Sequence, residues 1–305
     1  MRVFDRRVVR MHRDRAAANI EGHAFLFDDV ADRLAERLLD VKRDFPTAIE
    51  IGCRGGRANA LPSRYAGTEM LTRCDLSFEM ARRGGGTAIV ADEEALPFRD
   101  ACVDLVYSNL SLHWVNDLPG ALLQIRRALK PDGLFLAAML GGGTLAELRN
   151  SLMEAESETA GGVSPRVSPF AELRDIAGLL QRAGFALPVA DRDTIVVTYE
   201  GLPQLLADLR GMGETNAICE RQRHFTRRET LMRAATHYAS RFAQADGRIP
   251  ATFDVVFMHG WAPDDSQQQP LRPGSAQTRL ATALQTDEIS AGEKAAPQKP
   301  AAEDT

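Results

Sequence analysis

The feature of this sequence that most restricts its fold is a glycine-rich turn between an apolar run and a helix-compatible segment. Residues 48–51 favour a β-strand, Gly52, Gly55 and Gly56 follow closely, and residues 57–65 suit a helix. Glycine lets the backbone adopt positive φ and approach a ligand, and the helix N-terminus beyond it presents unpaired N–H groups. This order predicts a nucleotide-type cofactor site within an α/β fold.

The spacing of the turn distinguishes two cofactors. A dinucleotide fingerprint, Gly-x-Gly-x-x-Gly, would place glycine at positions 54 and 57, where the chain has Arg54 and Arg57. An S-adenosylmethionine site has an acidic residue two positions before the first glycine, which Glu50 and Gly52 match, and Gly56 matches its last glycine. The pattern favours S-adenosylmethionine over a nicotinamide dinucleotide. An ordinary αβ turn with incidental glycines is the structural alternative.

Arg54 stands where the S-adenosylmethionine pattern has its middle glycine. If that position requires φ > 0, an arginine costs roughly 1–2 kcal/mol there, and its side chain also crowds the ligand. We therefore expect Arg54 to weaken the site and Arg54→Gly to tighten it.

Polar residues follow several of the apolar runs. Ligands of an open parallel sheet bind outside the carboxyl ends of its strands. Asp75, 19 residues beyond Gly56, can accept from ribose hydroxyls, and Asp92 can accept from an adenine amino group. The predicted cofactor-binding set is Glu50, Gly52, Gly56, Asp75, Leu76, Asp92, Glu93 and Asn109.

Apolar runs alternate with helix-compatible segments from about residue 47 to residue 139, which predicts a parallel sheet with helices on both faces. A turn at Lys130–Gly133 is expected before the last of these strands. Two further strands, at 194–199 and 253–258, enclose a helical insertion at about 200–250 that we interpret as a lid. The expected fold is α/β, a Rossmann-like sheet.

Three zones are expected along the chain. Residues 1–46 form an N-terminal helical cap, and residues 47–261 form the cofactor-binding domain. Residues 262–305 contain no aromatic residue and few large aliphatic ones, so they are predicted to be a disordered tail.

Composition excludes several classes. A net charge of −5 argues against a dedicated nucleic-acid binder. No run approaches the roughly 20 apolar residues of a membrane span, and the arginine-rich start lacks the apolar core of a secretory signal. The four cysteines are scattered, and the six histidines show no metal-binding spacing. We expect a cytoplasmic protein with no metal site, and the sequence carries no signal for its oligomeric state.

The segment from His113 to Pro119 joins polar and aromatic residues. His113 is a candidate base or substrate contact, and Trp114 a candidate wall of the pocket. The alternative is that Trp114 packs in the core and that Asn116 or Asp117 caps the next helix.

Longer segments resemble known families. Several segments resemble class I S-adenosylmethionine-dependent methyltransferases of the type-11 group. They are the glycine-rich turn, Asp75, Leu96-Pro97-Phe98, Asp104-Leu105-Val106 and Leu129 to Gly133. More specific segments resemble the methyltransferase-like assembly factors of respiratory complex I, over roughly residues 3–261. Among them are Phe4-Asp5-Arg6, Ala91 to Phe98, Leu110 to Pro119, Gly211 to Glu214 and Gly260-Trp261.

That resemblance implies an S-adenosylmethionine-binding protein that hydroxylates an arginine on a core subunit of complex I. Two alternatives stay open. One is an O- or N-methyltransferase acting on a small or carrier-bound substrate, similar to malonyl carrier-protein methyltransferase. The other is a scaffold that keeps the fold to bind a partner. Methyl transfer gains most of its rate from positioning, so the lack of a catalytic dyad does not separate them.

Overall fold

The computed structural model describes residues 2–54, 67–83, 86–268, 275 and 278–287. The chain divides into two compact units, Met1–Asp265 and Ser266–Thr305. The first unit contains the sheet and the candidate site, and the second contains the short helix α10 (Leu280–Leu284). None of the described helices is long and apolar enough to cross a bilayer.

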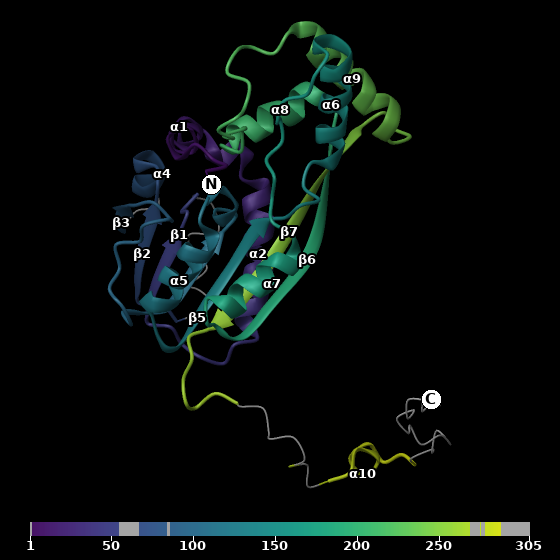
Figure 1. The fold of residues 1–305 in the computed structure, drawn as a ribbon. Coiled ribbons are helices and arrows are strands. Elements are labelled where there is room, and N and C mark those ends of the chain that lie inside the picture. The colour runs from purple at the N-terminus through teal and green to yellow at the C-terminus, as the bar shows by residue number, and fades with distance from the viewer. Residues whose placement is uncertain (1, 55–66, 84–85, 269–274, 276–277, 288–305) are drawn as a thin grey trace, which may run out of the picture. The chain divides into compact units, whose positions relative to one another are not determined.

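The described strands of the first unit form one seven-stranded sheet in the order β3-β2-β1-β4-β5-β7-β6. Strands β1 to β5 pair in parallel, and β7 runs antiparallel between β5 and β6 (Figure 1). The strands are β1 (Thr47–Ile51), β2 (Met70–Asp75), β3 (Thr87–Val90), β4 (Val103–Asn109), β5 (Leu129–Leu140), β6 (Ala186–Tyr199) and β7 (Ile249–Trp261). The α/β, Rossmann-like class predicted from the alternation is confirmed.

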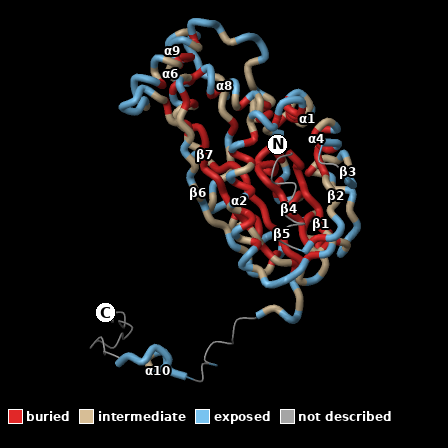
Figure 2. Tube along the Cα trace, turned by 180° about the vertical axis from the view of Figure 1, so that it is seen from behind, coloured by how far each residue is buried: buried red, intermediate tan, exposed pale blue. Residues whose placement is uncertain are grey.

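Side-chain alternation along the central strands divides the core between two faces. Leu105 and Leu136 pack in a cluster with helix α2 (Phe25–Leu39). Val106 and Phe135, one residue along, pack in the opposite cluster with α5 (Leu118–Ala128) and α7 (Leu173–Arg182). This two-residue period is the geometry of a strand covered on both faces. Figure 2 shows the central strands as the most continuously buried part of the chain.

The register brings the ends of three strands to one edge. Ile51 of β1 pairs with Cys74 of β2 and with Ser108 of β4. The residues that follow, Gly52, Asp75 and Asn109, therefore emerge side by side at the carboxyl edge of the sheet. This adjacency is what the sequence pattern predicted.

The N-terminal segment is fastened across this edge. Phe4 forms an isolated antiparallel bridge with Ile218, and Cys219 N–H donates to Val3 O at 2.8 Å. Asp5 then caps helix α1 (Arg6–Ala17) by accepting from Arg7 N–H, as an N-cap aspartate does. The helix packs beside α4 (Phe78–Arg83) and α8 (Leu202–Gly211).

Two helices are inserted between β6 and β7: α8 and α9 (Arg228–Phe242). Helix α9 packs on α6 (Ala146–Ala160), and Tyr238 Oη donates to Pro250 O at 2.7 Å. Figure 1 shows α6, α8 and α9 gathered at one end of the β6–β7 ribbon.

Several predicted boundaries differ from the structure. Strands β6 and β7 extend well beyond 194–199 and 253–258, because they pair with each other almost throughout. The expected turn at Lys130–Gly133 is instead an irregularity inside β5: Val103 pairs with Leu129, and the next pairing jumps to Leu105 and Leu134. The helix predicted over 57–65 lies outside the described residues.

Candidate active site

Asp75 lies at the end of β2 and is completely buried. Its Oδ1 accepts from Ser77 N–H at 2.7 Å, whereas its Oδ2 has no hydrogen-bond partner among the described residues. Burial raises the pKa of Asp75, and the nearby Arg13 charge opposes that rise. A buried carboxylate with an unused acceptor is unusual enough to suggest a missing donor.

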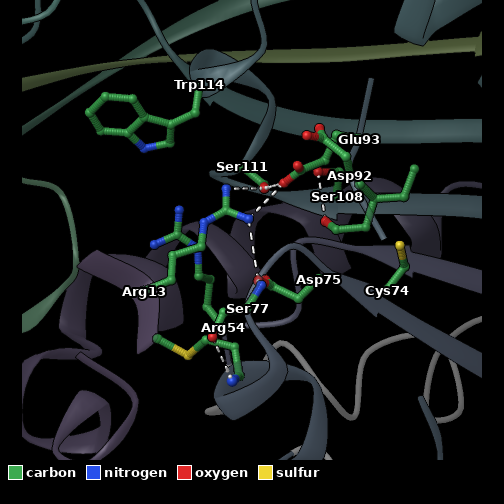
Figure 3. Close-up of polar contacts among 12 residues, drawn as sticks. Arg13, Arg54, Cys74, Asp75, Ser77, Asp92, Glu93, Ser108, Ser111 and Trp114 are labelled. Carbon is green, nitrogen blue, oxygen red and sulfur yellow. Dashed lines mark hydrogen bonds and ion pairs between the residues drawn. The ribbon is translucent and has the colours of Figure 1, made fainter. Parts of the chain in front are cut away.

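Arg13 of α1 reaches between the carboxylates of this edge (Figure 3). Its Nη1 lies 2.7 Å from Glu93 Oε1 and 3.4 Å from Asp75 Oδ1, and its Nη2 donates to Ser111 Oγ at 2.9 Å. Burial alone would raise the pKa of Glu93, but the guanidinium groups of Arg13 and Arg6 outweigh it and hold that pKa well below its usual range. The result is a buried, charge-compensated cluster.

The other predicted cofactor residues differ in their surroundings. Asp92 is 30% exposed and accepts from Arg6 Nη2 at 2.6 Å. Asn109 Nδ2 donates to Phe27 O at 2.9 Å, and its Oδ1 has no partner among the described residues. Leu76 is partly buried and packs near Trp114.

Glu50 and Gly52 lie at the end of β1. Glu50 is buried, and its pKa is raised to about 7 by burial, which outweighs the attraction of Arg73 at 3.4 Å. Gly52 has φ +76°, and a Cβ there would come within 2.1 Å of the Ser111 side chain, so only glycine fits. Gly56 lies outside the described residues.

Arg54 does not behave as expected. Six described non-glycine residues have positive φ, and Arg54 is not one of them, so the backbone penalty inferred from the sequence does not apply. Its buried guanidinium lies 2.9 Å from Glu214 Oε1 and donates to Met212 O at 3.2 Å. Arg54 therefore ties the glycine-rich turn to the segment after α8.

Glu214 is the centre of a second buried cluster. Its Oε2 accepts from Trp114 Nε1 and contacts His113 Nε2, both at 2.9 Å. Burial raises the pKa of Glu214, but Arg54 and His113 outweigh it and lower that pKa to about 2. Glu214 is therefore an anion at neutral pH.

His113 is buried, and burial lowers its pKa, so its imidazole is neutral. Leu140 N–H points at Nδ1 from 3.5 Å, which leaves Nε2 as the nitrogen that donates to Glu214. The alternative role predicted for this segment is confirmed at Asp117, which caps α5 by accepting from Gly120 N–H at 2.9 Å.

A cavity of about 560 Å³ opens beside the Glu214 cluster. Its walls come from α1, α2, α6, α8 and the segment between α8 and α9, together with Leu110 just beyond β4, Leu140 of β5 and Phe253 of β7. Trp114 and Glu214 line it, whereas His113 does not. Of the two candidate catalytic residues, Trp114 thus lies in the cavity wall and His113 does not.

Sequence reasoning missed Arg13 and the role of Glu214. Both act through partners about 60 to 160 residues away in the chain, a separation that local patterns do not reveal. The one available signal was the predicted N-terminal helical cap over residues 1–46, which is rich in arginine at its start. The described residues include no cluster of histidine, cysteine and carboxylate side chains that could hold a metal ion.

Comparison with known proteins identifies the family. Residues 49–137 match a family model described as "Methyltransferase domain". The chain is 42% identical over 287 residues to the zebrafish (Danio rerio) protein named arginine-hydroxylase NDUFAF5, mitochondrial, covering 92% of this chain and 89% of that protein. The chain belongs to the NDUFAF5 arginine-hydroxylase family.

More distant relatives share the NDUFAF5 scaffold. Malonyl-[acyl-carrier protein] O-methyltransferase of Methylovorus sp. is 33% identical, covering 86% of this chain and 90% of that protein. The crystal structure of the YcgJ protein from Bacillus subtilis has a TM-score of 0.53 at 16% identity, over 76% of this chain and 99% of that one, which is a likeness of fold. Relatives named NDUFAF5 are mitochondrial by name, so this comparison overturns the expected cytoplasmic location.

Proposed function

We propose that this NDUFAF5-family protein binds S-adenosylmethionine and modifies an arginine side chain of a core subunit during the assembly of respiratory complex I. Hydroxylation is the modification we favour. The observation that carries the proposal is the 42% identity to an arginine hydroxylase across nearly the whole length of both chains.

The residues at the sheet edge fit the cofactor. The unpartnered Oδ2 of Asp75 is an acceptor of the kind that a ribose hydroxyl needs, and Asn109 contributes a second unpartnered oxygen. Gly52 keeps the turn close to the strand ends, and Asp92 and Glu93 would face the adenine side. When bound, S-adenosylmethionine supplies a sulfonium-activated methyl group.

Arg13 modifies this fit. It already occupies Asp75 Oδ1 and Glu93 Oε1, so a ribose would be left with Asp75 Oδ2. Arg54, at the position of the pattern's middle glycine, pairs with Glu214, whose side chain lines the cavity. We therefore assign cofactor contacts to Asp75 and Gly52 and assign the Arg54–Glu214 pair to the substrate side.

The second candidate function is methyl transfer to a carrier-bound carboxyl group. It is supported by the 33% identity to malonyl-[acyl-carrier protein] O-methyltransferase. The lower identity makes it the weaker proposal.

The mass of the substrate separates these functions. Peptide mapping of the complex I core subunit from cells lacking this gene should show the loss of about 16 Da, one oxygen atom, at an arginine. Loss of about 14 Da would indicate methylation, and an unchanged mass would leave only a scaffold role. Asp75→Ala should fail to restore the modification, whereas Asp100→Ala, at an exposed surface pair with Arg127, should restore it.

A further inference from the structure

The mouth of the cavity carries two arginines from different helices. Arg15 of α1 and Arg210 of α8 both line it and both are exposed. Arg15 Nη2 donates to Thr215 Oγ1 at 3.0 Å, but within the described ranges neither arginine has a carboxylate inside 4.0 Å. Burial lowers the pKa of Arg15, and the like charge of Arg210 adds to that effect. Like charges held together without a counter-ion favour an anion.

The segment before α9 adds further charge and an aromatic ring. His224 and Phe225 line the mouth, and Arg223 and Arg227 are their exposed neighbours. Arg221 also lines it but already pairs with Asp5 at 3.8 Å. Phe225 is 99% exposed. A fully exposed aromatic side chain beside a cavity is typical of a contact with another protein.

The interior of the cavity is different. Leucine and phenylalanine side chains dominate it, among them Leu26, Phe27, Leu148 and Phe253. Among the described lining residues, Glu214 is the one acidic side chain, and Arg54 already balances it. The chain as a whole carries a net charge of −5, so the positive mouth is a local reversal of the overall charge.

We propose that this cationic mouth, formed by Arg15, Arg210 and Phe225, docks an acidic segment of the protein substrate, whose target side chain enters the apolar interior. The proposal rests on the proposed function, since it takes the substrate to be a protein. The cationic mouth would repel a target arginine of the substrate by itself. Carboxylates that flank the target arginine in the substrate's sequence would offset that repulsion. A flat anionic bilayer would meet Phe225 but could not follow the concave wall behind it.

Binding of labelled peptides to the full chain tests this docking, with fluorescence anisotropy as the measurement. The probe is a short fluorescein-labelled peptide with aspartates and glutamates on both sides of one arginine. The comparison peptides carry asparagine and glutamine flanks, or keep the acidic flanks with alanine at the centre. We expect the acidic-flanked peptide with the central arginine to bind at least about fivefold more tightly than the neutral-flanked one, with the difference shrinking at high salt.

Two variants locate the binding at the mouth. Arg15→Glu combined with Arg210→Glu should weaken binding of the acidic peptide by more than about fivefold, because attraction becomes repulsion. The matched control is Arg174→Glu combined with Arg182→Glu, which makes the same charge change at exposed positions of α7 that do not line the cavity. Phe225→Ser should also weaken binding, and its full exposure means that it leaves folding intact.

The outcomes separate this proposal from the proposed function. Tight binding of the acidic peptide with alanine at its centre would support the docking site while removing support for an arginine target. Equal binding of neutral and acidic peptides, or an unchanged affinity in the mouth variant, would overturn the docking site. So would binding to phosphatidylglycerol vesicles in place of the peptides, because that would make the mouth a lipid contact.

Discussion

Replacing Glu214 with glutamine should destabilise the protein strongly at neutral pH. The carboxylate is 6% exposed, lies 2.9 Å from Arg54 Nη2, and accepts from His113 and Trp114. Glutamine keeps an acceptor for these two donors but leaves the Arg54 guanidinium buried without its anion. Removing one partner of a buried ion pair typically costs about 3–5 kcal/mol.

The pKa of Glu214 gives a second value for the same cost. Its pKa falls from an ordinary 4.5 to about 2 in the folded protein, which corresponds to about 3 kcal/mol of stability at neutral pH. A folded-state pKa below the unfolded one stabilises the protein above pH 4.5, and this contribution is lost as the pH falls towards 2. The cost of Glu214→Gln should therefore shrink over that window.

Urea unfolding at pH 7 and at pH 4, with a thermal melt at each pH, measures this cost. We expect a loss of about 3 kcal/mol and a melting temperature lower by roughly 6–12 °C at pH 7, with a smaller loss at pH 4. The control is Glu220→Gln, an exposed glutamate in the same segment, which should change stability by less than about 0.5 kcal/mol.

A double variant completes the test. Adding Arg54→Met to Glu214→Gln removes the buried cation as well, so it should recover part of the lost stability. A loss below about 1 kcal/mol in Glu214→Gln, or a loss that is the same at both pH values, would refute the buried-pair argument.

Three further predictions concern the cofactor edge and the tail. Calorimetry should detect binding of S-adenosylmethionine and not of NADH. Asp75→Asn should weaken the binding of S-adenosylmethionine by about tenfold or more. Binding of NADH alone would contradict the cofactor assignment. The pKa of Glu50 is raised to about 7, so ionisation of this buried carboxyl removes stability as the pH rises from 4.5 through 7. Glu50→Gln should therefore raise the free energy of unfolding at pH 8 by about 1–3 kcal/mol. No gain would mean that Arg73 compensates fully for the charge of Glu50. A chain truncated after Asp265, where the first compact unit ends, should keep its melting temperature, and a loss of several degrees would show that the tail packs on that unit.

The central sheet could be predicted because each of its strands is specified locally. β4 contains the apolar run Leu105-Val106-Tyr107, and its neighbours carry similar runs between helices, which is the pattern of a covered parallel sheet. The gathering of the strand-end residues at one edge could be predicted from this sheet, since parallel strands align their carboxyl ends. Asp75 and Gly52 were found in this way.

The two buried clusters could not be predicted in the same way. Arg13 is one arginine among many in the first helix, and its burial depends on carboxylates that a separate part of the sheet supplies. Arg54 was misjudged because the sequence pattern describes a ligand contact, whereas its side chain turns towards Glu214. Interactions of this kind depend on tertiary packing, which sequence spacing does not encode.

The attachment of the N-terminal segment determines when the site is completed during synthesis. Val3 and Phe4 pair with residues 218 and 219, and 203 residues separate His12 from its partner Thr215. At roughly 5–20 residues per second, the first helix leaves the ribosome on the order of 10–40 s before those partners exist. During that interval α1 can pack on α4 but lacks its hydrogen bonds to residues 215–219. The helix made first is therefore fully fastened only when residue 219 has been synthesised, and a ribosome that stalls before it would leave a chain able to form its parallel strands but without the Phe4–Ile218 bridge that holds α1 across the candidate site.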